Sequence, residues 1–178
     1  MKELNRRAFL TLTGAALAMM ALTACGADDA PAVPPAPAAP TGKEAKVLEA
    51  INKYRGELPA LTLDSGLNKA AEEVAKIAKG EVEYNPENMK ALSAAFTDYK
   101  GFCKPIGVRA DNDGTHVTPV CVYSDNAEEM AQNLNNQLDE GDKASLSSPA
   151  IKLVNIKTFE RNGVTYWIAL IAESKVTA

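Results

Sequence analysis

Apolar residues recur at helical spacing in four segments of the chain. The most regular stripe lies within residues 64–80, where Leu67, Ala70, Ala71, Val74, Ile77 and Ala78 share one face and Glu and Lys fill the other. This pattern predicts an amphipathic helix that begins after Asp64-Ser65 and ends at Gly80. Similar stripes predict helices from a Thr41–Glu44 capping box to Arg55, from Asn85-Pro86-Glu87 to Gly101, and from Asp125 or Asn126 to Leu138. Residues 140–148 are polar and are expected to form a loop.

Two other regions have the composition of β-hairpins. Residues 151–159 and 164–173 are rich in strand-forming residues and are joined through Asn162-Gly163, a strong hairpin signal. The second run is largely apolar at both even and odd positions, so this strand is expected to be covered on both sides. A further hairpin is expected between residues 103–109 and 115–123, around the turn-forming residues 110–114.

The order of these elements is three helices, a hairpin, a helix and a hairpin. Helices can then cover both faces of a small antiparallel sheet. The sequence therefore predicts an α+β fold, an α-β-α sandwich in which about four helices flank two hairpins.

The first 25 residues have the features of an export signal. Arg6-Arg7 precedes an apolar run over residues 8–22, and this pair with its neighbours resembles a twin-arginine motif. The run is short for a membrane span, which favours a signal peptide over a transmembrane helix. Leu22-Thr23-Ala24-Cys25 resembles a bacterial lipobox. We therefore expect residues 1–24 to be removed and Cys25 to carry lipid, which anchors the protein to a membrane on its extracytoplasmic side.

The Pro- and Ala-rich residues that follow Cys25 cannot bury a core. Residues 25–41 are expected to be a lipidated Cys and a semi-rigid tether about 40 Å long, and residues 42–178 a single domain. The chain has 19 basic and 23 acidic residues, of which three basic and one acidic residue lie in residues 1–24. The remaining chain has 16 basic and 22 acidic residues and a formal charge of −6. This charge argues against binding to nucleic acid or to anionic lipid.

Two cysteines remain in the domain, an even pair for an oxidising compartment. A hairpin that folds symmetrically about Asn112 places Cys103 opposite Cys121, close enough for a disulfide. Such a bridge would contribute about 3 kcal/mol. The alternative is two separate buried thiols.

Four stretches resemble the CAP superfamily, the cysteine-rich secretory, antigen 5 and pathogenesis-related proteins, whose bacterial members are called SCP-like. They are residues 47–55 with Asn52 and Arg55, residues 58–71, residues 124–130, and residues 165–168 in the last hairpin. The resemblance implies a CAP-like sandwich with a cavity that usually holds two His and two Glu, of which the His pair can bind a divalent metal.

The chain departs from the family at this cavity. Tyr84 stands at the first His position, and residues 140–149 contain no His. A zinc site needs three or four converging ligands, so no metal and no cofactor are expected. Tyr84 and Glu87 are candidate residues of a cavity rim, although Tyr84 can also be a simple packing residue.

His116, the only histidine, is the remaining candidate for chemistry. It follows the expected hairpin turn, and the alternative is an exposed loop histidine. We expect a membrane-tethered, non-catalytic binding module of the cell envelope. Its partner would be a small apolar molecule, a peptide or an envelope protein. The competing hypotheses are a divergent hydrolase around His116 and a purely structural envelope lipoprotein.

Overall fold

The computed structural model describes residues 42–111 and 114–176. The predictions for Arg6, Arg7, Cys25 and the Thr41 cap lie outside the described residues. The described residues all belong to one compact unit, which contains every described helix and strand.

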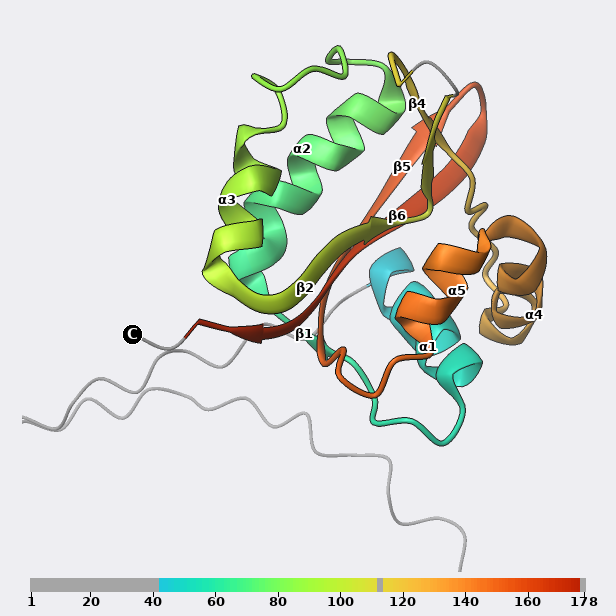
Figure 1. Ribbon diagram of the computed structural model, residues 1–178. Helices are drawn as coiled ribbons and strands as arrows, with labels where there is room; N and C mark the ends of the chain where they lie inside the picture. The colour runs from blue at the N-terminus through green and yellow to red at the C-terminus, as the bar shows by residue number, and fades with distance from the viewer. Residues whose placement is uncertain (1–41, 112–113, 177–178) are drawn as a thin grey trace, which may run out of the picture. The chain divides into compact units, whose positions relative to one another are not determined.

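A four-stranded sheet forms the middle of this unit (Figure 1). Its strand order is β1-β5-β6-β2, and all neighbours are antiparallel except β1 and β5. The strands are β1 (Thr62–Leu63), β5 (Leu153–Arg161), β6 (Val164–Lys175) and β2 (Tyr99–Ile106).

The β5–β6 hairpin confirms the sequence prediction. Arg161 pairs with Val164, so the loop is Asn162-Gly163, and both residues have positive φ, 53° and 75°. These are the dihedral signs that a tight type I′ turn requires and that Asn and Gly adopt at least cost.

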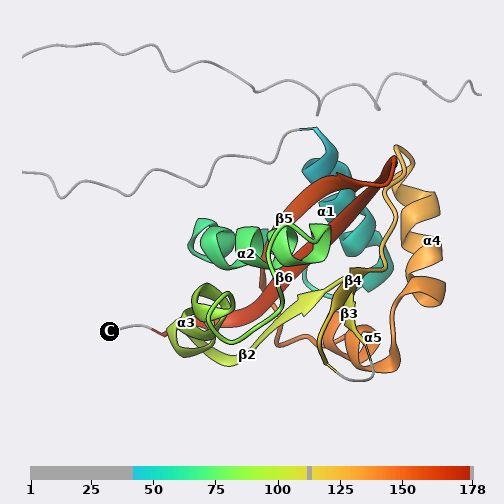
Figure 2. The same cartoon turned by 90° about the horizontal axis from the view of Figure 1, so that it is seen from above.

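The two faces of β6 bury two separate clusters, one on each side of the sheet. Trp167, Ala169 and Ile171 pack with α1 (Lys43–Arg55), α4 (Ala127–Gln137) and α5 (Glu140–Leu146). Ile168, Leu170 and Ala172 pack with α2 (Asn68–Lys79) and α3 (Lys90–Asp98). Helices therefore lie on both sides of the sheet, as Figure 2 shows. The prediction of an α+β fold is confirmed, and so is that of a last strand covered on both sides.

Local capping explains where two of the helices begin and end. The Asp64 carboxylate accepts the Gly66 N–H at 2.9 Å and starts a short 3₁₀ turn that leads into α2. Gly80 ends α2 in the left-handed conformation. The Asn126 side chain accepts the N–H groups of Glu128 and Glu129 at the start of α4.

Two helix predictions need correction. α3 begins at Lys90 rather than near Pro86, because the Asn85 side chain accepts the Asn88 N–H at 2.9 Å and closes a turn. Residues 140–146, expected to be a loop, form α5. Only Asp142 and Leu146 of this short helix are buried, so it shows no apolar stripe.

The register predicted for the first hairpin is also wrong. β2 pairs with β6, and only β3 (Val108–Ala110) and β4 (Val117–Pro119) form a ribbon, with Val108 opposite Pro119. Gly107, at φ 86°, separates β2 from β3 and redirects the chain. Of the described β2 side chains, Tyr99 and Ile106 are buried, one in each of the two clusters that β6 separates.

This correction removes the reason for pairing the two cysteines. Cys103 lies opposite Ala172 in β6, whereas the Cys121 carbonyl accepts the Trp167 N–H at 3.0 Å. Five residues of strand correspond to roughly 16 Å, while a disulfide needs Cα atoms within about 7 Å. The two side chains also belong to the clusters on opposite faces, and both thiols are free. The predicted bridge therefore loses its register argument, and thiol labelling of the unfolded, unreduced chain tests it.

Candidate functional site

The candidate site is a pocket of about 370 Å³ that wraps around the edge strand β2. Consecutive residues of this strand point to opposite faces of the sheet. Pro105 lies opposite Leu170, on the α2 face, and Lys104 lies opposite Ile171, on the α5 face. The pocket therefore receives side chains from both outer layers.

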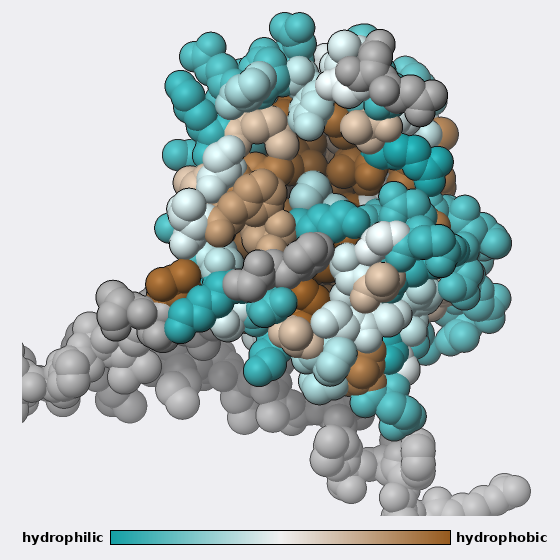
Figure 3. All heavy atoms as spheres, in the orientation of Figure 1, coloured by the Kyte–Doolittle hydropathy of each residue, from teal (hydrophilic) through white to brown (hydrophobic). Residues whose placement is uncertain are grey.

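One wall of the pocket is apolar. It consists of side chains from α2, from the segment before α3, from β2 and from the β3–β4 ribbon: Val74, Ile77, Met89, Pro105, Val108 and Val117. Figure 3 shows hydrophobic surface gathered in this hollow, bordered by hydrophilic surface toward α5. The apolar stripe of α2 extends into this wall, because Val74 and Ile77 belong to the buried face of the helix and also line the pocket.

The opposite wall carries charge. Asp142, 3% exposed, forms an ion pair with Lys104 and accepts the Gly107 N–H. Burial raises the pKa of Asp142 above its usual value, although Lys104 partly opposes this effect. Asp139 caps α5 by accepting the Asp142 N–H at 2.7 Å. This wall is thus held by a connected set of polar contacts between α5, β2 and Gly107.

Arg109 differs from the other charged groups of the pocket. It lies in β3 opposite Thr118 and is exposed, and within the described part of the chain no hydrogen bond or ion pair engages its guanidinium. Burial raises the pKa of the Cys121 thiol; Asp142 raises it further, and Arg109 lowers it. The Arg109 charge therefore acts on the same small region as the Asp142 carboxylate.

A second hollow of about 470 Å³ adjoins the first. It shares Ile77, Tyr84 and Val117 with the first pocket and adds His116. His116 Nδ1 lies 3.0 Å from Asp111 Oδ2 and 2.7 Å from Thr115 Oγ1. In a Ser-His-Asp arrangement the acid and the hydroxyl contact opposite ring nitrogens. Here both partners contact the same nitrogen, so Thr115 is not placed as a nucleophile.

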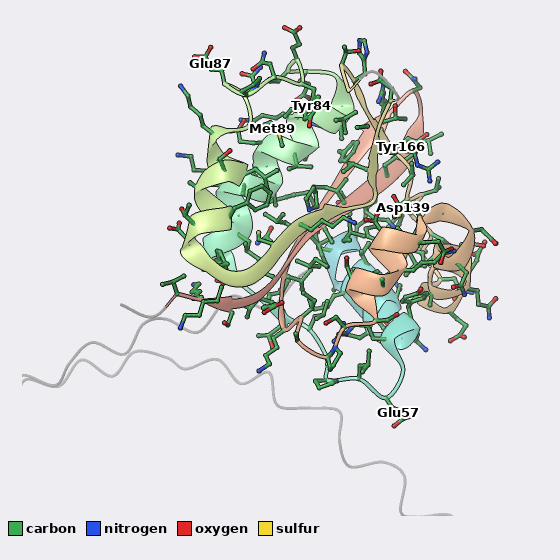
Figure 4. The ribbon with its side chains drawn as sticks, viewed as in Figure 1. Glu57, Tyr84, Glu87, Met89, Asp139 and Tyr166 are labelled. Carbon is green, nitrogen blue, oxygen red and sulfur yellow. The ribbon has the colours of Figure 1, made fainter. Side chains whose placement is uncertain are left out.

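The residues predicted for a cavity rim are placed differently from one another. Tyr84 lines both hollows, and His116 lines the second. Glu87 lies at the outside of the molecule, away from Tyr84, Met89 and Asp139 (Figure 4), and its carboxylate is 3.7 Å from the Lys90 ammonium. The sequence predictions missed Lys104, Arg109, Asp139 and Asp142. Asp139-x-x-Asp142 has the spacing of a helix start, which was the available signal for two of them.

Two residues of the CAP-like stretches stabilise the fold away from the pocket. Arg55 is 4% exposed, and its guanidinium donates to the carbonyls of Leu146, Pro59 and Ile151, among others. The Asn52 side chain accepts the Leu61 N–H at 2.9 Å. Arg55 therefore connects α1 to the segments that follow α1 and α5, and Asn52 connects α1 to the segment that follows it.

Searches for a metal site and for a membrane span are negative over residues 42–111 and 114–176. No group of three or more His, Cys, Asp or Glu side chains is arranged to hold a metal ion. No helix in the same part of the chain has the length and apolar character that a bilayer crossing requires.

Neither a scan against protein-family models nor a search of curated proteins finds a match to this sequence. The resemblance to the CAP superfamily therefore continues to rest on the four stretches of sequence.

Proposed function

We propose that this chain is an extracytoplasmic lipoprotein with a CAP-like domain, which binds a small ligand in the pocket beside β2 without catalysing a reaction. The observation that carries the proposal is the pocket itself. At about 370 Å³, with an apolar wall and a few fixed polar groups, it has the size and lining of small-molecule sites.

Binding without catalysis is the role that best fits the polar groups of this pocket. The Asp142 carboxylate is engaged by Lys104 and the Gly107 N–H, and Asp139 caps a helix. These contacts hold the pocket in shape. The lipobox-like residues ending at Cys25 and the Pro-rich residues 26–40 support a location at the membrane surface of the envelope.

The pocket is tested with the chain from residue 25 onward carrying Cys25→Ser, purified without detergent. Native mass spectrometry reports any retained ligand, and titration with the neutral probe N-phenyl-1-naphthylamine reports an available apolar site. Ala110→Trp adds an indole at an exposed position of the lining, and Ala94→Trp adds the same group on α3, away from the pocket. We expect Ala110→Trp alone to reduce binding. No ligand and no probe binding, or equal binding by both variants, would contradict the proposal.

The anchor is tested separately in cells. Cys25→Ala should leave the precursor uncleaved and unlabelled by a fatty-acid probe. Normal labelling of this variant would rule out Cys25 as the lipidated residue.

A hydrolase around His116 is the second candidate function. The observation that favours it is the 3.0 Å contact that orients the imidazole toward Asp111. If the protein hydrolyses any substrate and His116→Ala does not slow that reaction, this candidate is removed. A purely structural lipoprotein, the third hypothesis, is favoured if the pocket binds neither a retained ligand nor the probe.

A further inference from the structure

The two walls of the pocket beside β2 differ in chemistry, and this difference narrows the class of ligand. The α2 side offers mainly hydrocarbon and thioether surface, from residues such as Val74, Ile77 and Met89, and its one phenolic hydroxyl is that of Tyr84. The α5 side offers charged groups. A ligand that contacts both walls must itself be amphipathic, with its apolar and polar parts at opposite ends.

The partners that each charged group of the lining already has indicate whether the polar end of the ligand is positively or negatively charged. Both carboxylates of the lining already have partners: Asp142 is held by Lys104 and the Gly107 N–H, and Asp139 accepts the Asp142 N–H. Lys104 is committed to Asp142. Arg109 is the charged group of the lining that has no hydrogen-bond or ion-pair partner among the described residues.

A positively charged ligand would be less well accommodated. It would meet the charges of Lys104 and Arg109, and the Asp142 carboxylate is already engaged by Lys104 and the Gly107 N–H, which leaves the second oxygen of Asp139 as its acceptor. An anion instead adds a partner to the Arg109 guanidinium, which has none among the described residues. The fork of N–H donors on Arg suits carboxylate and phosphate oxygens in particular.

The volume limits the size of the ligand. At about 30 Å³ for each small group, 370 Å³ holds roughly twelve non-hydrogen atoms. The part of a ligand that the pocket encloses therefore has about the size of a medium-chain or aromatic acid, and the two acyl chains of a phospholipid would extend beyond it.

We propose that the pocket binds one small amphipathic anion, with its apolar body against the α2 wall and its carboxylate or phosphate on the Arg109 guanidinium. This inference rests on the proposed function, which holds that the pocket binds a small ligand, and adds the class of that ligand and the residue that selects it.

Isothermal titration of the Cys25→Ser chain from residue 25 onward tests the inference with three probes that share a ten-carbon chain. They are decanoate, which has about twelve non-hydrogen atoms and so matches the volume, 1-decanol, which is neutral, and decylamine, which is cationic at pH 7. We expect decanoate to bind about tenfold or more tightly than the other two, as a charge-assisted hydrogen bond to a head group predicts. Decyl phosphate against decanoate then distinguishes the two sources of the anion.

Three variants assign the preference to Arg109. Arg109→Gln should weaken the binding of decanoate about tenfold and leave the affinity for 1-decanol unchanged. Arg109→Lys should bind decanoate with an affinity between those of Arg109→Gln and the parent, because it keeps the charge but loses the paired N–H donors of the guanidinium. Lys46→Gln removes one equally exposed charge from α1, outside the pocket, and should change neither affinity. Because Arg109 is exposed, these substitutions should leave the urea midpoint unchanged.

The failures of the two proposals can be told apart. Equal affinities for the three probes, tighter binding of decylamine, or an unchanged decanoate affinity in Arg109→Gln would overturn the anion inference. If N-phenyl-1-naphthylamine still binds and Ala110→Trp still weakens its binding, the proposal of a small-molecule pocket is retained and the anion inference alone is rejected. Absence of binding by every probe would overturn both.

Discussion

Replacing Gly107 by Ala tests how the fold positions the ribbon that forms one side of the pocket. A Cβ at this position would lie 2.9 Å from the Trp167 backbone oxygen and 3.4 Å from the Cys121 side chain. Trp167 and Cys121 are both fully buried, so neither neighbour can move aside easily. The residue also has φ 86°, a conformation that an L side chain rarely adopts.

The expected cost of Gly107→Ala follows from these contacts. The left-handed conformation costs about 1–2 kcal/mol for a residue with a Cβ. Relief of the 2.9 Å contact would disturb the hydrogen bond from the Val120 N–H to the Gly107 carbonyl, worth about 1 kcal/mol. We therefore expect a loss of about 2–3 kcal/mol in the free energy of unfolding.

Urea unfolding measures this loss, and Gly80→Ala is the matched control. Gly80 has nearly the same φ, 82°, but a Cβ there meets nothing within 4 Å. It should therefore show the conformational cost alone, about 1–2 kcal/mol. With a slope of about 1.5 kcal/mol per molar urea, the midpoint should fall by about 1.5–2 M for Gly107→Ala and by about 1 M for Gly80→Ala. If Gly107→Ala costs no more than Gly80→Ala, the close approach to Trp167 does not constrain the ribbon.

Three further outcomes are expected. Arg55→Met should lower the free energy of unfolding by about 3 kcal/mol, because it leaves several buried carbonyls without a donor. The control Lys53→Met removes an exposed ion pair and should cost under about 1 kcal/mol. Equal effects of the two substitutions would contradict this role of Arg55. Burial opposes the ionisation of Asp64, but contacts with Lys175, the Gly66 N–H and Tyr99 outweigh burial and lower the pKa of this carboxyl group. The ionised carboxylate therefore stabilises the fold, and this stability is lost as the pH falls through the folded-state pKa. Asp64→Asn should accordingly destabilise the protein at pH 7 and progressively less in acid, and a pH-independent difference in urea midpoints would refute this. Finally, the unfolded, unreduced Cys25→Ser chain should react with two maleimides, since the two thiols lie on opposite faces of the sheet, and no adduct would restore the disulfide.

The elements that the sequence predicted correctly are those with signals confined to a few neighbouring residues. The stripe and caps of α2 depend on residues one to four positions apart, and the Asn162-Gly163 turn depends on two adjacent dihedral preferences. The two-sided apolar pattern of β6 likewise predicted a last strand covered on both sides, and with it the α+β class.

The elements that were predicted incorrectly depend on distant partners. β2 pairs with β6 and not with the nearby residues 115–123, because pairing with a buried strand covers more apolar surface than a solvent-exposed hairpin does. α5 became a helix although its sequence is polar, since Asp139 caps its first turn and Leu146 anchors it to the core.

The pocket was likewise decided by tertiary structure. The sequence singled out Tyr84, Glu87 and His116 through a family resemblance and the scarcity of histidine. Tyr84 lines both hollows and His116 lines the second, whereas Glu87 lies outside them. The sequence could not bring Lys104, Arg109 and Asp142 together, because their proximity requires the turn at Gly107 and the packing of α5 beside β2. Local dihedral and capping preferences are encoded within a few residues of sequence, whereas the chemistry of this site arises where three separately encoded elements meet at the edge of the sheet.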